Sequence, residues 1–252
     1  MKNIYKRNFL KDVIFRIDFV NPINVNSFVQ DNLPELRKMY PLYSPIKLKQ
    51  NNIKVNFDEV KGDTVERMET IQVKQIFFNA SRTAQMKISS NALIINYKKY
   101  DDFDLLYKDI VNVLELLTKN SNIIVGRTGL RYINIFENND LNKIDWSKYI
   151  IPSMLFIENW NNSNVLQHMS VANIKKDECI LKIQYGLFNG EIPNDRVKDS
   201  YVLDIDASSV EMCELVVVKE QIGKWNDYVR EIFEYSITEQ MKEKLNDETS
   251  KL

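Results

Sequence analysis

The fold is decided by the stretch Gly126-Arg127-Thr128-Gly129-Leu130-Arg131-Tyr132-Ile133-Asn134-Ile135-Phe136, together with Tyr201-Val202-Leu203-Asp204-Ile205-Asp206-Ala207. In both stretches the side chains alternate with the period of two residues that is typical of a β-strand. Charged side chains occupy one of the two alternating sets, and the other set is largely apolar. Each stretch therefore predicts a buried strand that carries charges on one face.

The charged positions of these strands are the first candidate site. Arg127 and Arg131 share one strand face and Asn134 lies on the other, while Asp204 and Asp206 share a face. If the two strands are neighbours, we expect Arg131 to pair with one of the aspartates, because a guanidinium and a carboxylate form parallel hydrogen bonds. A second interpretation stays open, in which the arginines bind an anion and the aspartates line a polar groove.

Patterns along the rest of the chain predict further strands and helices. Alternation predicts strands at residues 11–20, 71–79, 83–89, 92–98, 123–136, 165–174, 179–187 and 201–207, and a short hairpin around Asn51-Asn52 within residues 46–57. Residues 61–69 are polar and predict a loop. Helical spacing predicts one helix from a cap at Asn26 or Ser27 to Met39, one over residues 103–118, a short one at 144–149, and a long one from a cap at Ser208 or Ser209 to about Leu245.

This order of elements predicts an α+β fold. We expect one extended, twisted antiparallel sheet with two long helices on one face, formed by two similar halves at about residues 10–120 and 121–246. No Pro-, Gly- or Ser-rich linker lies near residue 120, so residues 1–252 are expected to form a single domain. The uncovered sheet face, or the groove between the halves, is the expected binding surface. An uncovered sheet edge also allows a homodimer.

Composition limits the classes of function. The net charge is −1, there are two cysteines, and no run of about 18 apolar residues occurs, so we expect a cytoplasmic protein with reduced thiols and no membrane segment. The polar N-terminus predicts no secretory signal. The sequence contains six glycines and no phosphate-binding glycine motif, and one histidine and two distant cysteines lack the spacing of zinc ligands. We therefore expect no cofactor and no metal.

Catalysis is not expected, and the alternative that stays open is a metal-dependent nuclease. Asp204 and Asp206 lie two residues apart on one strand face and offer two oxygen ligands for Mg²⁺. Such a site requires a third acid, and the triplet that begins at Glu59 and ends at Lys61 is of a kind frequent by chance. His168 has no nucleophile motif near it.

Two further features indicate binding. Residues 70–99 contain no acidic side chain, and their cations are candidates for contacts with nucleic acid, namely Lys74, Arg82, Lys87 and Lys98. Trp160 lies in a polar loop, where it either packs on the sheet edge or contacts a partner.

The chain resembles the "sporadically distributed" bacterial protein family, whose members have about this length and no characterised activity. The resemblance rests on Gly129-Leu130-Arg131-Tyr132-Ile133-Asn134, on Leu203-Asp204-Ile205-Asp206, on Leu93-Ile94-Ile95-Asn96-Tyr97, on the first strand and on the last helix with Trp225 and Phe233. It implies an accessory role, of the kind seen in mobile elements, phage conflict or toxin regulation.

Together these features predict a non-catalytic binding protein. Its expected partner is another protein, in a bacterial conflict setting such as phage defence or toxin regulation. A nucleic-acid-binding protein with a basic sheet face is the alternative, and the nuclease is the second alternative.

Overall fold

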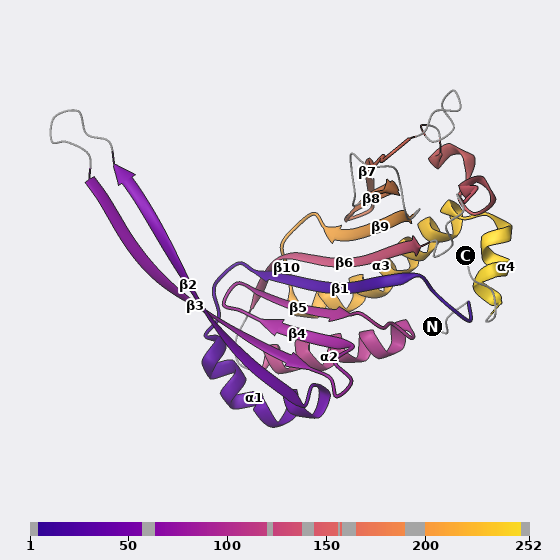
Figure 1. The fold of residues 1–252 in the computed structure, drawn as a ribbon. Helices are drawn as coiled ribbons and strands as arrows, with labels where there is room; N and C mark the ends of the chain where they lie inside the picture. Colours follow the sequence, from indigo (N-terminus) through magenta and orange to yellow (C-terminus); the bar gives the residue numbers. More distant parts are fainter. Residues whose placement is uncertain are drawn as a thin grey trace.

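The computed structural model describes residues 5–56, 64–119, 123–137, 144–155, 157, 165–189 and 200–247. These residues form an α+β fold, which confirms the predicted class (Figure 1). The strands are β1 (Leu10–Phe19), β2 (Leu42–Asn56), β3 (Thr64–Phe78), β4 (Ala84–Ile88), β5 (Ala92–Tyr97), β6 (Ile124–Glu137), β7 (Ser170–Lys176), β8 (Cys179–Phe188), β9 (Ser200–Ser209) and β10 (Cys213–Glu214). The helices are α1 (Val25–Met39), α2 (Phe103–Thr118), α3 (Leu215–Ser236) and α4 (Glu239–Asn246), with the short 3-10 helices η1 (Trp146–Lys148) and η2 (Pro152–Met154).

The described strands form one antiparallel sheet in the order β2-β3-β4-β5-β1-β6-β9-β8-β7, and β10 pairs with the start of β6. The first strand of the chain, β1, lies beside β6 in the middle of the sheet. Strands β2 to β5 lie on the β1 side of this central pair, and strands β7 to β9 lie on the β6 side. This order places the two charged stretches, on β6 and β9, directly side by side. The internal repeat of the two halves stays a prediction.

Three helices cover one face of the sheet (Figure 1). α1 packs on β3, α3 packs on β6 and β9, and α2 lies between α1 and α3. The prediction placed two long helices on this face, and the structure adds α1 as a third. The apolar residues of α1 are buried in the same core, namely Phe28, Val29 and Leu36. No helix within the described residues combines the length and the apolar character that crossing a bilayer requires.

The strands β2 and β3 form a long two-stranded ribbon. Their register runs from Leu42 opposite Phe78 to Asn56 opposite Thr64, but β4 pairs only with the last four residues of β3, Gln75 to Phe78. The rest of the ribbon projects from the body of the molecule (Figure 1). The predicted hairpin around Asn51-Asn52 is therefore wrong, because both residues lie inside β2. The predicted loop at 61–69 is wrong over Thr64 to Glu69, which belong to β3.

Several predicted boundaries differ from the structure. The cap of α1 is Asn24, whose Oδ1 accepts a hydrogen bond from the Ser27 amide at 3.1 Å, whereas Asn26 accepts one from the side chain of Gln75. Pro34 lies inside α1 without ending it. The predicted strand at 165–174 starts only at Ser170, and the predicted short helix at 144–149 is the single 3-10 turn η1.

The prediction of one long helix from a cap at Ser208 or Ser209 to about Leu245 is wrong in two respects, the position of the cap and the absence of a break. Ser208 and Ser209 belong to β9, and Ser209 accepts a hydrogen bond from the Thr128 amide on β6. The helix then ends at Ser236, because Ile237 is extended and bridges to Ile150. Thr238 caps the separate helix α4.

Candidate functional site

The face of the sheet opposite the three helices is called the open face below. None of the described helices lies over it (Figure 1). Side chains alternate along each strand, so the residues between the core positions of β1, β6 and β9 point toward this face. Four of the residues predicted to form a site therefore share it, namely Arg127, Arg131, Asp204 and Asp206.

A bidentate ion pair between Arg131 and Asp204 lies at the centre of the open face. Arg131 donates from Nε at 2.8 Å and from Nη2 at 2.5 Å to the two carboxylate oxygens of Asp204. Asp204 is only 6% exposed, whereas the side chain of Arg131 is 41% exposed. These hydrogen bonds from the guanidinium raise the pKa of Arg131. The predicted pairing of Arg131 with an aspartate is confirmed, and it links β6 to β9.

Two more ion pairs surround this one. Arg127 donates to Asp206 at 3.1 Å, again between β6 and β9. On β1, Arg16 donates from Nη2 to Asp18 at 2.7 Å. The carboxylates of Asp204 and Asp206 are thus both held by arginines. Within the described residues, no three His, Cys, Asp or Glu side chains are grouped so that they could hold a metal ion. The Glu59 and Lys61 of the predicted triplet lie outside the described residues.

Aliphatic side chains lie among these charges. Ile94 on β5, Ile14 on β1 and Ile133 on β6 occupy diagonal positions across three neighbouring strands of the open face. All three are partly exposed. The solvated face of an antiparallel sheet is ordinarily polar, and these three isoleucines add apolar area to its centre.

The cations predicted to contact nucleic acid fall into two groups. Lys74 and Lys87 lie on the open face of adjacent strands, where Lys87 is opposite Ile76 in register. Arg82 and Lys98 lie at one end of the sheet. The guanidinium of Arg82 stacks 5.2 Å from the centre of the Phe78 ring, and the Lys98 amide donates to the Thr83 carbonyl. The structure therefore does not gather the four cations into one patch.

The remaining predicted site residues are separate from the open face. Asn134 lies on the helix-covered face of β6, is 3% exposed, and donates from Nδ2 to the Leu203 carbonyl at 3.2 Å. Trp160 lies outside the described residues. His168 shares a hydrogen bond with Ser170 at 2.9 Å. Burial raises the pKa of the Cys179 thiol to about 11, which disfavours the reactive thiolate.

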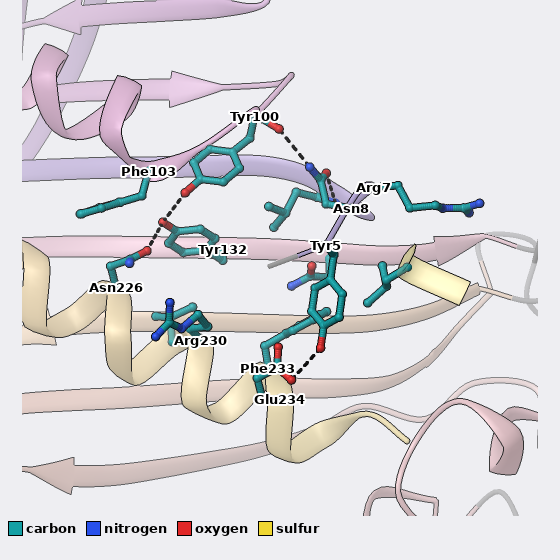
Figure 2. A pocket seen from close by; sticks show the side chains of 14 residues that line it. Tyr5, Arg7, Asn8, Tyr100, Phe103, Tyr132, Asn226, Arg230, Phe233 and Glu234 are labelled. Atoms are coloured by element: carbon teal, nitrogen blue, oxygen red, sulfur yellow. Dashed lines mark hydrogen bonds between the residues drawn. The ribbon is translucent and has the colours of Figure 1, made fainter. Parts of the chain in front are cut away.

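A second candidate site lies on the helix-covered side, and of its lining residues Asn134 alone is among the candidates predicted from the sequence (Figure 2). It is named the tyrosine pocket. Its volume is about 120 Å³, and its lining includes Tyr5, Tyr100, Phe103, Tyr132, Asn134 and Asn226. The N-terminal segment, β6 and α3 form its walls. A signal was present in the sequence, because Tyr132 and Asn134 occupy the buried face of a strand, where polar groups are uncommon.

A chain of hydrogen bonds runs along this pocket (Figure 2). The hydroxyls of Tyr100 and Tyr132 lie 3.2 Å apart, and Tyr132 donates to Oδ1 of Asn226 at 2.8 Å. Burial raises the pKa of Tyr100 to about 12 and that of Tyr132 well above its ordinary value. Both tyrosines are thus neutral at physiological pH, and they fix the orientation of the Asn226 amide.

The chain matches no protein-family model and no curated protein.

Proposed function

We propose that this chain is a non-catalytic binding protein that recognises another protein through the open face. The observation that carries the proposal is the diagonal of isoleucines, Ile94, Ile14 and Ile133, in the centre of a sheet face that the described helices leave uncovered. The accessory role in bacterial conflict that the resemblance implies is part of this proposal and rests on the resemblance alone.

The chemistry of the open face favours a protein as the partner. Protein interfaces combine an apolar centre with arginines and a polar rim, and the isoleucines and paired arginines supply such a centre. A polyanion is disfavoured here, because the charges of Arg127 and Arg131 are already neutralised by ion pairs with Asp206 and Asp204. The net charge of −1 for the whole chain points in the same direction.

The test is a capture experiment from native cell extract, with and without nuclease, using the tagged full-length chain and two variants. Ile133→Glu places a charge at the centre of the open face. Val216→Glu makes the same change on α3, where Val216 is 60% exposed, and serves as the matched control. We expect a protein that survives nuclease treatment to be lost with Ile133→Glu and kept with Val216→Glu.

Other outcomes would overturn the proposal. A protein retained equally by both variants would place the recognition surface elsewhere. Capture of a second copy of this chain alone, confirmed by sedimentation, would identify the open face as a homodimer interface instead.

A specific observation supports nucleic acid as the second candidate. Lys74 and Lys87 lie on the same face, and neither forms an ion pair within the part of the chain that the structure describes. If nucleic acid is the ligand, material captured from extract is removed by nuclease, and Lys74→Gln with Lys87→Gln weakens binding and reduces its salt dependence.

A further inference from the structure

Strand β7 forms one edge of the sheet, and no described strand lies on its outer side (Figure 1). Its register with β8 runs without a shift from Ser170 opposite Tyr185 to Lys176 opposite Cys179. Edge strands usually carry a proline, a bulge or charged side chains, which prevent pairing with another chain. The other edge strand, β2, contains Pro45, whereas β7 contains no proline and no bulge, and its first five residues are uncharged. β7 is therefore the less protected of the two edges.

The backbone of β7 offers hydrogen bonds on its outer side. The His168 amide donates to the Leu187 carbonyl at 3.1 Å, in the same register that joins β7 to β8. Hydrogen-bonded pairs of an antiparallel ladder recur at every second residue, so the even-numbered residues of β7 bond to β8. The amides and carbonyls of its odd-numbered residues point outward and have no partner within the described residues, namely those of Val171, Asn173 and Lys175.

Apolar side chains are exposed on both sides of this edge. Val171 lies on the open face, in register with Gln184 and Asp204, and is 53% exposed. Ile174 lies on the other face and is 45% exposed. Both would lose exposed apolar area if a further strand paired with β7, and cross-strand contacts of this kind stabilise a sheet.

We propose that β7 pairs with β7 of a second copy of this chain, antiparallel and centred on Asn173. Asn173 is the middle residue of β7, so this register overlaps all seven residues of the strand. Asn173 is also one of the residues whose backbone groups point outward. The backbone groups of Asn173 therefore bond to those of Asn173 in the second copy, and those of Val171 bond to those of Lys175.

The side chains fit the same register. Directly opposed residues share a face, so Val171 lies against Lys175 of the second copy, and Ala172 lies against Ile174. No like charges are opposed, whereas a register centred on Lys175 would place that lysine opposite itself. The twofold axis is perpendicular to the sheet, so the open faces of both copies point the same way. The inference does not rest on the function proposed for the open face, because the contact uses only the edge.

The first test is sedimentation of the full-length chain at about 1 to 100 μM, a range that reveals micromolar affinity. We expect a dimer that Val171→Lys weakens by about tenfold, because the new lysine lies opposite Lys175 at two places. Val216→Lys makes the same change at a similarly exposed position on α3 and should leave the dimer unchanged. Asn173→Pro removes the outward amide at the centre without removing a hydrogen bond to β8, so we expect a folded monomer.

A disulfide tests the register. Opposed residues of a hydrogen-bonded pair have Cα atoms about 5.5 Å apart, which a disulfide spans. Under mild oxidation we expect Asn173→Cys to crosslink two copies more than the native chain does. Lys175→Cys is the control, because its thiol lies opposite Val171 of the second copy.

Three results overturn the proposal. They are a chain that stays monomeric over the whole concentration range, a dimer that Val171→Lys and Asn173→Pro both leave intact, and equal crosslinking of the two cysteine variants. A dimer that is lost with Ile133→Glu and kept with Val171→Lys would also overturn it, because the contact would then lie on the open face.

Discussion

At the scale of single residues, Arg131 and Asp204 show how burial decides the value of an ion pair. The side chain of Asp204 is 8% exposed and receives two hydrogen bonds from one guanidinium, whereas the side chain of Asp206 is 23% exposed and receives one from Arg127. A buried charge that loses its partner is costly, whereas an exposed pair contributes little.

Replacing the two arginines separately tests this difference. We expect Arg131→Met to lower the free energy of unfolding by about 2 kcal/mol, since it leaves Asp204 buried and unpaired. Arg127→Met is the matched control and should cost less than about 1 kcal/mol, because water reaches Asp206. Urea denaturation measures both. Equal losses would contradict the role assigned to burial.

Glycine substitutions provide a second comparison between single residues. Gly186 has a φ of +144°, and a Cβ at this position would lie 2.0 Å from the His168 carbonyl oxygen, so Gly186→Ala should destabilise the fold by about 3 kcal/mol or more. Gly223 lies in α3, where an added Cβ meets nothing within 4 Å, so Gly223→Ala should stabilise it by about 0.5 kcal/mol or more. Thermal melting measures the two opposite shifts. A stable Gly186→Ala variant would mean that the segment at His168 does not lie on β8.

At the scale of elements, the cap of helix α1 lies two residues before Asn26 and three before Ser27, the two caps that the sequence suggests. Asn26 and Ser27 are both good caps by residue type, but Asn26 is engaged by Gln75 of β3, and Asn24 caps the helix instead. Local sequence does not distinguish between these possible N-cap residues. The hydrogen bond from Gln75 on β3 to Asn26 thus determines which residue caps the helix.

Alanine variants distinguish these alternatives. We expect Asn24→Ala to cost about 1 kcal/mol, the usual price of a lost side-chain cap. Ser27→Ala should change stability by less than about 0.5 kcal/mol, because the hydroxyl of Ser27 makes only a long exposed contact with Asp31 at 3.4 Å. Chemical denaturation measures both. The reverse order would restore Ser27 as the cap.

At the scale of the whole molecule, buried tyrosines join the layers. Tyr40, at the end of α1, and Tyr97, at the end of β5, both donate to Oδ2 of Asp109 on α2, at 2.7 and 2.6 Å. Burial is the main cause that raises the pKa of both hydroxyls. The same cause raises the pKa of Tyr5, Tyr100 and Tyr132.

These tyrosines predict alkaline sensitivity. Below pH 10 they are neutral in both states, and above pH 10 they ionise first in the unfolded chain, so the stability that they contribute is lost as pH rises through 10 toward the higher folded values. We expect the melting temperature to fall steadily above pH 10. In the control Tyr97→Phe, the fall should be shallower, although the variant is less stable at pH 7 by about 1 kcal/mol. Parallel curves for the two proteins would contradict this assignment.

The sequence by itself determined the α+β class and the boundaries of α2, and it offered the pairing of Arg131 with an aspartate, which the adjacency of β6 and β9 then decided. These depend on local periodicity, on the cap at Asp102 and on charges fixed to one strand face. The ribbon of β2 and β3, the break at Ile237 and the tyrosine pocket were decided only by tertiary structure. Their physical causes are contacts between residues far apart in the chain: a register across two long strands, a bridge from Ile237 to Ile150, and a hydrogen bond from Tyr132 to Asn226.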